Sequence, residues 1–231
     1  MSDSVFWLES VHPLWFPLSV IGIFLLCIVL LAEGLNRFTA MDGELTRKVV
    51  HIGTGNVILL AWWFNIPSWL GIGASIIASC LALVSYFTPI LPSINSVGRR
   101  SLGTFFYAVS IGVLISWFWP MGQPQYAVLG ILVMTWGDGM AAVIGQQFGK
   151  HPYEVWGSHK SWEGSLAMMG MSFLVSALVL LSSVDNSGLT WITALLVAIM
   201  ATSLEMFSKL GIDNLTVPLV SGFLAYFVLN F

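Results

Sequence analysis

An aspartate lies in the middle of a long apolar segment, within the sequence TWGDGMAAVIGQQFG that ends at Gly149. A charged side chain at the centre of a membrane helix costs about 2.5–3.5 kcal/mol on insertion scales, so such a carboxylate is a candidate for function. Asp138 would suit Mg²⁺, which takes one or two carboxylates and leaves its other positions to water and phosphate oxygens. The alternative is structural, with Asp138 simply paired to Lys160 or Arg47.

Small residues follow Asp138 at intervals that place them on one face of a helix. They are Ala141, Ala142, Gly145 and Gly149. A stripe of this kind allows a second helix to pack closely. We therefore expect the aspartate to face a helix bundle instead of lipid. The same stripe would also allow two copies of the chain to pack together as a homodimer.

The loop that follows carries a second polar group, in the sequence KSWEG. Lys160 and Glu163 are three residues apart, and we expect them on one face at the start of the next helix. A helix N-terminus offers free N–H groups and a positive dipole to a phosphate. In the structural alternative, Ser158 or Ser161 caps this helix.

A basic cluster, RKVVH, opens the second apolar segment. Arg47 and His51 are four residues apart and share a helix face, with Lys48 beside them. Contact with phosphate is the functional interpretation, and anchoring to lipid headgroups with a topology signal is the competing one. For Arg99 and Arg100, before the fourth apolar segment, the topology signal is the stronger interpretation.

The last polar group lies between the final two apolar segments, in LGIDNLTVPL. Asp213 or Asn214 could cap the last helix, and Gly211 is expected to end the helix before it. Glu205 lies inside the seventh segment, where the cost of burying a charge again favours a function.

These groups together bring carboxylates, basic residues and two helix N-termini to one interface, which could hold Mg²⁺ and a polyphosphate. Phosphoryl transfer depends mainly on positioning, metal and cationic stabilisation of charge. The acceptor would be a lipid that reaches the site from the bilayer. The chain has no GxxxxGK[ST] loop, so the fold of soluble P-loop nucleotidases is not implied.

The elements that must position these residues are membrane helices. Of the 231 residues, 57% are hydrophobic and only 8% are charged, whereas soluble domains carry about 25% charged residues. A helix needs about 20 apolar residues to cross the hydrocarbon core. Eight segments qualify as candidates: 15–33, 49–65, 67–88, 102–120, 125–148, 161–184, 189–207 and 215–231. We expect one all-α membrane domain over 1–231, with eight transmembrane helices, or seven if the last segment is re-entrant.

Charge supports this count, because all eight Lys and Arg residues follow the first, third, fifth or seventh segment. The positive-inside rule then places these loops in the cytoplasm and both termini outside. A net charge of −3 without a long basic run gives no support to nucleic-acid binding. The N-terminus lacks the basic region of a cleaved signal peptide. His151 and His159 lack a third ligand at metal spacing, so we expect them to be solvated in a flexible loop.

The succession RKVVH, GDGMAAVIGQQFGK, GSHKSWEGS and LGIDNLTVPL resembles the membrane prenol kinases, over about residues 45–220. This family includes phytol and dolichol kinases and is related to the phosphatidate cytidylyltransferases. The resemblance implies transfer of the terminal phosphate of a nucleoside triphosphate, often CTP, to an isoprenoid alcohol such as phytol. The product, phytyl phosphate, feeds tocopherol synthesis. The resemblance also implies a cyanobacterial plasma or thylakoid membrane, with the active site on the cytoplasmic side.

The resemblance implies roles for matching residues: Asp138 as a metal ligand, Lys160 and Glu163 at the nucleotide or metal, and Asp213 and Asn214 as the family's Asp-Asn motif. We expect the metal set to be Asp138, Glu163 and Asp213, and either of the last two could instead accept the alcohol proton. Arg47, Lys48 and His51 match the first basic motif.

Two other functions remain as alternatives. The cytidylyltransferases end in a longer Asp-Arg-x-Asp signature, which this chain replaces with GIDNLTVPL, so cytidylyl transfer to phosphatidate ranks second. An ion-coupled transporter would use Asp138 and Glu205 as ion sites, but we find no internal repeat of the kind that transporters often show.

Overall fold

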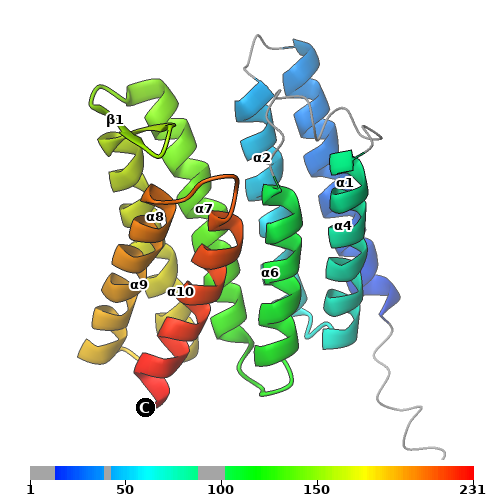
Figure 1. The fold of residues 1–231 in the computed structure, drawn as a ribbon. Coiled ribbons are helices and arrows are strands. Elements are labelled where there is room, and N and C mark those ends of the chain that lie inside the picture. Colours follow the sequence, from blue (N-terminus) through cyan, green and yellow to red (C-terminus); the bar gives the residue numbers. More distant parts are fainter. Residues whose placement is uncertain (1–13, 39–42, 88–101) are drawn as a thin grey trace, which may run out of the picture.

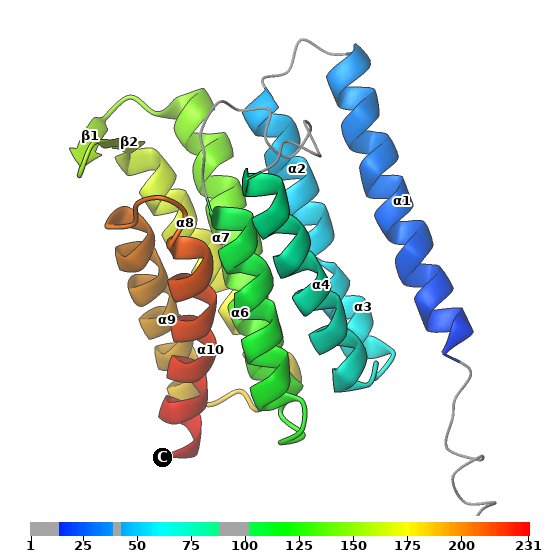
Figure 2. The ribbon, with the colours of Figure 1, turned by 45° about the vertical axis from the view of Figure 1, so that its right-hand side comes forward.

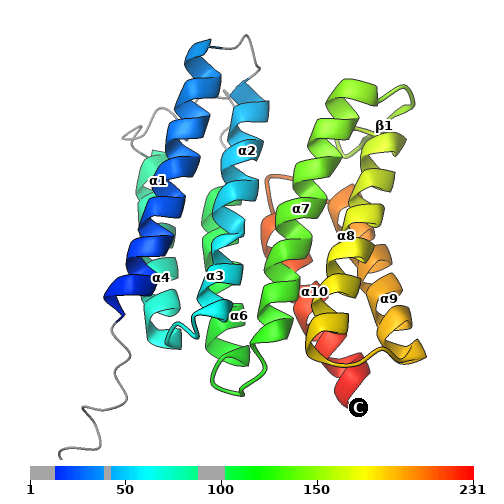
Figure 3. The same cartoon turned by 180° about the vertical axis from the view of Figure 1, so that it is seen from behind.

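The computed structural model describes residues 14–38, 43–87 and 102–231, and these are almost entirely helical. The helices run side by side in two rows (Figures 1 and 3). One row holds α1 (Trp15–Phe38), α2 (Gly43–Gly55) with α3 (Val57–Trp63), α7 (Pro124–Phe148) and α8 (Trp162–Ser183). The other holds α4 (Ser68–Phe87), α6 (Gly103–Phe118), α10 (Asp213–Asn230) and α9 (Gly188–Met206). The predicted all-α class is confirmed.

Five of these helices are long and apolar enough to cross a membrane, namely α1, α4, α7, α8 and α9. Helix α6 is apolar but only 16 residues long. Helix α10 has 18 residues and carries Pro218 in its interior. The chain is thus an integral membrane protein, while the count of seven or eight crossings stays a prediction.

The second apolar segment is divided into α2 and α3 at Asn56. The Asn56 side-chain amide donates to the carbonyl oxygen of Ile52 at 2.7 Å, which competes with the backbone ladder of the helix. Gly53 and Gly55 immediately before it weaken the helix further. A broken helix therefore takes the place of one continuous span over 49–65.

Helix α3 continues α2 in the same direction, and otherwise successive helices alternate in direction, so the described connections between them gather at two ends of the bundle (Figure 2). One end, which we call the hairpin end, holds a β-hairpin between α7 and α8 and the connection from α9 to α10. Helix α1 begins and α10 ends at the opposite end. This arrangement brings the described basic residues to the hairpin end, as the sequence predicts, but which side of the membrane this end faces stays a prediction.

Helix α7 is the centre of the bundle. In its most apolar stretch 61% of the residues are buried, against 6% for α1. Helix α10 lies very close to it, because a Cβ on Gly130 would overlap the carbonyl oxygen of Pro218. The core, around Leu114, Phe118 and Leu129, is thus built largely on α6, α7 and α10.

The connection from α7 to α8 is an ordered hairpin, so the prediction of a flexible loop there is wrong. Strands β1 (Pro152–Val155) and β2 (Ser158–Ser161) pair antiparallel. They are joined by Trp156 and Gly157, whose φ values of 50° and 79° suit a two-residue hairpin turn. The hairpin ends at Ser161, whose hydroxyl caps α8 by accepting from the Gly164 N–H at 3.2 Å. This is the cap that the structural alternative in the sequence analysis assigned to Ser158 or Ser161.

The connection from α9 to α10 differs from expectation at both ends. Helix α9 ends at Met206, five residues before Gly211, and Leu210 and Gly211 form a turn with φ values of 59° and 84°. Helix α10 begins at Asp213, with Ile212 at its N-cap and no side-chain cap. The prediction that Gly211 ends the seventh helix is therefore wrong, and the structural alternative in which Asp213 or Asn214 caps the last helix does not hold either.

Candidate active site

The intramembrane aspartate is paired with a buried lysine from the basic cluster. Lys48 Nζ on α2 donates to Asp138 Oδ2 on α7, and only 8% of the lysine side chain and 16% of the aspartate side chain are exposed. His51, one turn along α2, places Nε2 at 3.8 Å from the same oxygen. The structural alternative in the sequence named Lys160 or Arg47 as the partner, whereas the structure shows Lys48.

A hydrogen-bonded tyrosine adjoins this pair. The rings of His51 and Tyr107 lie 4.7 Å apart. The Tyr107 hydroxyl lies 2.6 Å from Thr135 Oγ1, which itself donates to the carbonyl oxygen of Ile131. Tyr107 is therefore the donor in the first bond. Sequence reasoning missed both residues, although Thr135 precedes Asp138 by three positions and so shares its side of the helix.

A second lysine–carboxylate pair joins the hairpin to α9. Lys160 Nζ lies 2.7 Å from Glu205 Oε1 and also donates to the Glu205 carbonyl oxygen. Lys160 lies on β2, whereas Glu163 lies in the first turn of α8. The expectation that these two residues share a helix face is therefore wrong, because Ser161 separates strand from helix.

Charge interactions link the two pairs through the start of α10. Asp213 lies close enough to Asp138, Lys160 and Lys48 to feel their charges. Glu205 likewise interacts with Asp138 and Asp213. We call these five residues the charge cluster. Asn214, next to Asp213, directs its side-chain amide to the Gly211 carbonyl oxygen at 3.3 Å.

Glu163, which was expected beside Lys160 at the nucleotide or metal, is instead paired with His151. Its Oε1 lies 2.6 Å from His151 Nδ1, and its Oε2 accepts from the His151 backbone N–H at 3.3 Å. The His151 side chain is 75% exposed, and His159 on β2 is exposed as well. Glu163 therefore fastens the hairpin to the start of α8 at the surface.

The hairpin is fastened to α8 at a second point by Tyr153. Its hydroxyl lies 2.6 Å from Ser165 Oγ. Burial raises the pKa of the Tyr153 phenol. The strand that carries Lys160 is thus held in a defined position.

The small-residue stripe on α7 packs against the start of α8, as predicted. A Cβ on Gly145 would lie 3.1 Å from Ser161 Oγ, and one on Gly164 would lie 2.9 Å from the Ala141 carbonyl oxygen. The other side of α7 meets α2, where Gly139 approaches Ile52. The stripe thus fixes α7 against α8 while Asp138 meets Lys48 on α2.

The predicted metal set is not assembled in this structure. Within 14–38, 43–87 and 102–231, no three Asp, Glu, His or Cys side chains lie close enough together to hold a metal ion. Asp138 and Asp213 belong to one cluster, and two carboxylates are enough for an Mg²⁺ whose other ligands are phosphate and water. Arg99 and Arg100 lie outside the described residues, as does the side chain of Arg47, whose backbone is in α2.

Comparison with known proteins identifies the family. The chain is 50% identical to phytol kinase of Synechocystis sp. over 214 residues, which cover 93% of this chain and 92% of that protein. The chain belongs to the phytol kinase family. Chloroplastic phytol kinase 1 of Arabidopsis thaliana is 29% identical over 86% of this chain and 71% of its own length. Chloroplastic farnesol kinase of the same plant is 30% identical over 80% and 66%. No family model and no solved structure matches.

Within the phytol kinase family, then, the motifs found in the sequence converge only in part. Lys48 pairs with Asp138, His51 lies beside that pair, and Asp213 lies within range of the charges of Asp138, Lys160 and Lys48. Glu163 instead faces the hairpin, and Glu205, which no motif contains, joins the cluster as the partner of Lys160.

Proposed function

We propose that this member of the phytol kinase family is a prenol kinase that transfers the terminal phosphate of CTP to phytol or a similar isoprenoid alcohol, giving phytyl phosphate. The observation that carries the proposal is the 50% identity to a phytol kinase over 93% of the chain. A soluble nucleotide and a membrane alcohol must meet at the bilayer surface. Lys160 on the hairpin and Asp213 at the start of α10 place charge-cluster residues at the hairpin end of the bundle, which supports such a meeting place.

The two lysines are the groups that would receive the phosphates. Without a nucleotide, Lys48 is neutralised by Asp138 and Lys160 by Glu205. An incoming triphosphate offers these ammonium groups a more highly charged partner, and phosphoryl transfer depends on such cationic stabilisation. Lys160 would then neutralise the charge that develops during transfer, with Lys48 in support.

The same exchange would free carboxylates for a metal ion. Asp138 and Asp213 could then each offer oxygens to Mg²⁺, which prefers one or two carboxylates together with phosphate oxygens. Bound Mg²⁺ would neutralise charge on the donor phosphates. Glu163 could take part only by leaving His151. Either Asp213 or Glu163 remains as acceptor of the alcohol proton, and Asp213 already lies in the cluster.

The proposal is tested with purified protein, Mg²⁺, phytol and CTP labelled at the γ-phosphate, followed by lipid extraction. Label in the lipid phase is expected, and it should be absent when EDTA replaces Mg²⁺ or when protein is omitted. Parallel reactions with ATP and UTP rank the donors. Label that enters lipid only from α-labelled CTP and phosphatidate would contradict a kinase and support cytidylyl transfer instead.

A further inference from the structure

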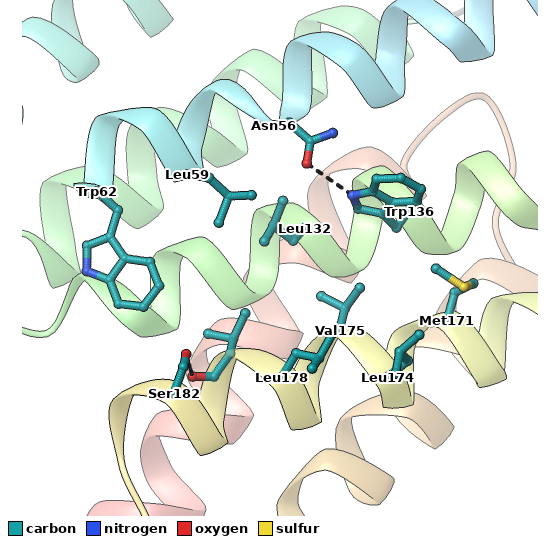
Figure 4. Close-up of a pocket in the computed structure, with 11 residues that line it drawn as sticks. Asn56, Leu59, Trp62, Leu132, Trp136, Met171, Leu174, Val175, Leu178 and Ser182 are labelled. Carbon is teal, nitrogen blue, oxygen red and sulfur yellow. Dashed lines mark hydrogen bonds between the residues drawn. The ribbon is translucent and has the colours of Figure 1, made fainter. Parts of the chain in front are cut away.

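An apolar groove lies between α3 and α8 and over α7 (Figure 4). Its volume is about 400 Å³, and none of its lining residues is charged. Leu132, Val175 and Val179 are buried beneath it, whereas Leu174 and Leu178 are 48% and 60% exposed. The groove therefore opens sideways on a face of the bundle that meets lipid.

One end of the groove reaches the level of the charge cluster. There Trp136 Nε1 on α7 donates to Asn56 Oδ1, at the break between α2 and α3, at 3.1 Å. Trp136 is two residues from Asp138, and Asn56 is five residues from His51. The Asn56–Trp136 pair thus provides polar atoms at the end of the groove that lies nearly level with Asp138 along α7.

The groove runs from this pair toward the opposite end of the bundle. Along α8 its lining extends from Met171, beside Trp136, to Ser182, beside Trp62. Eleven residues of helix rise about 16 Å, which is roughly half of the 30 Å hydrocarbon core. The groove thus occupies the half of α8 away from the hairpin end, and its upper end lies as deep in the bundle as Asp138.

We propose that this groove binds the isoprenoid chain of the alcohol substrate, with the hydroxyl group at the Asn56–Trp136 end and the chain tail beside Leu178 and Ser182. This inference rests on the proposed function for the identity of its ligand. The groove suits an isoprenoid alcohol because its lining is apolar between the Asn56–Trp136 pair at one end and Ser182 at the other, whose hydroxyl already donates to the Val179 carbonyl oxygen. The far end then limits chain length.

A second cavity adjoins the groove on the side of α1 and α3, where Phe24, Leu60 and Trp63 line it. The two share Asn56, Leu59, Trp62 and Ser182. The lining of this cavity includes no residue of α7, the helix that carries Asp138. We therefore assign the chain to the groove over α7.

The first test is to shorten the groove with Leu178→Trp. We expect the ratio of kcat/KM for phytol to that for farnesol, which is one isoprenoid unit shorter, to fall about tenfold or more, the size of discrimination that apolar pockets reach. Activity on farnesol shows that the variant is folded. The matched control is Leu195→Trp, an equally apolar and 49% exposed position on α9 outside the groove, where the ratio should not change. An unchanged ratio in Leu178→Trp would overturn the assignment.

A second measurement separates this inference from the proposed function, because it needs no catalysis. A prenol with a photoreactive diazirine at its tail is irradiated with the wild-type protein without nucleotide, and the labelled peptides are mapped by mass spectrometry. Labelling within 171–182 of α8, reduced by excess phytol and by Leu178→Trp but not by Leu195→Trp, is expected. Labelling confined to other helices would overturn the assignment of the chain to this groove, even if the protein is an active kinase. Labelling within 171–182 of a protein that lacks kinase activity would overturn only the proposed function.

Discussion

The two ends of the bundle satisfy their polar residues in different ways. At the hairpin end, Lys48 and Asp138 are 90 residues apart in sequence, and Lys160 and Glu205 are 45 apart. At the opposite end, Asp185 accepts hydrogen bonds from Ser187 at 3.0 Å and from Thr190 at 2.5 Å, all within one short connection. The two lysine pairs thus depend on tertiary packing, whereas Asp185 is satisfied locally, as is the pair of Arg37 with Glu33 on α1.

The difference supports the proposal that the site lies at the hairpin end. The Asp185 group is a local cap, since Ser187 also accepts from the Thr190 N–H at the start of α9. Such caps stabilise a helix end wherever it lies. The charge cluster contributes no cap, and it places ionised groups on α2, α7 and α9, where their desolvation is costly. An arrangement that costs stability and converges from separate segments is what a site requires.

The largest effect on activity should come from neutralising Asp138, and neutralising Asp185 at the opposite end provides the control. Asp138→Asn should lower phosphate transfer on the order of a thousandfold, because removing one preorganised charge from a reaction centre has effects of this size. Asp185→Asn is the matched control and should keep wild-type activity. The assay is transfer of γ-labelled phosphate to phytol, with retention of helical circular dichroism in both variants. Equal activity of the two variants would show that Asp138 has no role in phosphate transfer.

Sequence reasoning recovered most of the helix boundaries because each helix is an apolar run with a clear end. Helix α7 begins at Pro124 and ends at Phe148, within one residue of the expected range 125–148. The hairpin was missed because PYEV and SHKS are too short and too polar for a pattern to stand out, and Trp156 in a turn with positive φ is unusual.

The site was recovered as a set of residues, but its pairing was not. Helical periodicity predicts which residues share a face of one helix. It therefore predicted a shared face for Arg47 and His51 and, wrongly, for Lys160 and Glu163. It carries no information about which helices are neighbours. The partnership of Lys48 with Asp138 follows from the packing of α2 on α7, and the bond from Tyr107 to Thr135 follows from α6 beside α7.

A smaller effect should follow from breaking the second long-range pair. Lys160→Gln leaves the Glu205 carboxylate without its lysine in a site where both side chains are at most 15% exposed. The free energy of unfolding should fall by about 3 kcal/mol, at the lower end of the range for a broken buried pair. Denaturation in detergent, followed by circular dichroism, measures this change.

The double variant Lys160→Gln/Glu205→Gln separates stability from function. Replacing both charges removes the buried unpaired carboxylate, so most of the lost stability should return. Activity should stay low, because the lysine proposed to meet phosphate is still absent. Recovery of activity together with stability would assign Lys160 a structural role only.

The smallest expected effect is a pH-dependent change in Tm when the local cap at Asp185 is altered. Hydrogen bonds from Thr190 and Ser187 hold the pKa of Asp185 below its usual value, which is about 3.9 in an unfolded chain. The folded state therefore binds this proton less readily, so the contribution of Asp185 is complete above the unfolded pKa and is lost as pH falls through the folded one. The excess in Tm of wild type over Asp185→Asn should be constant near neutral pH and shrink below about pH 5. A difference that grows on acidification would contradict the cap, because the protonated carboxyl would then be the better acceptor for α9.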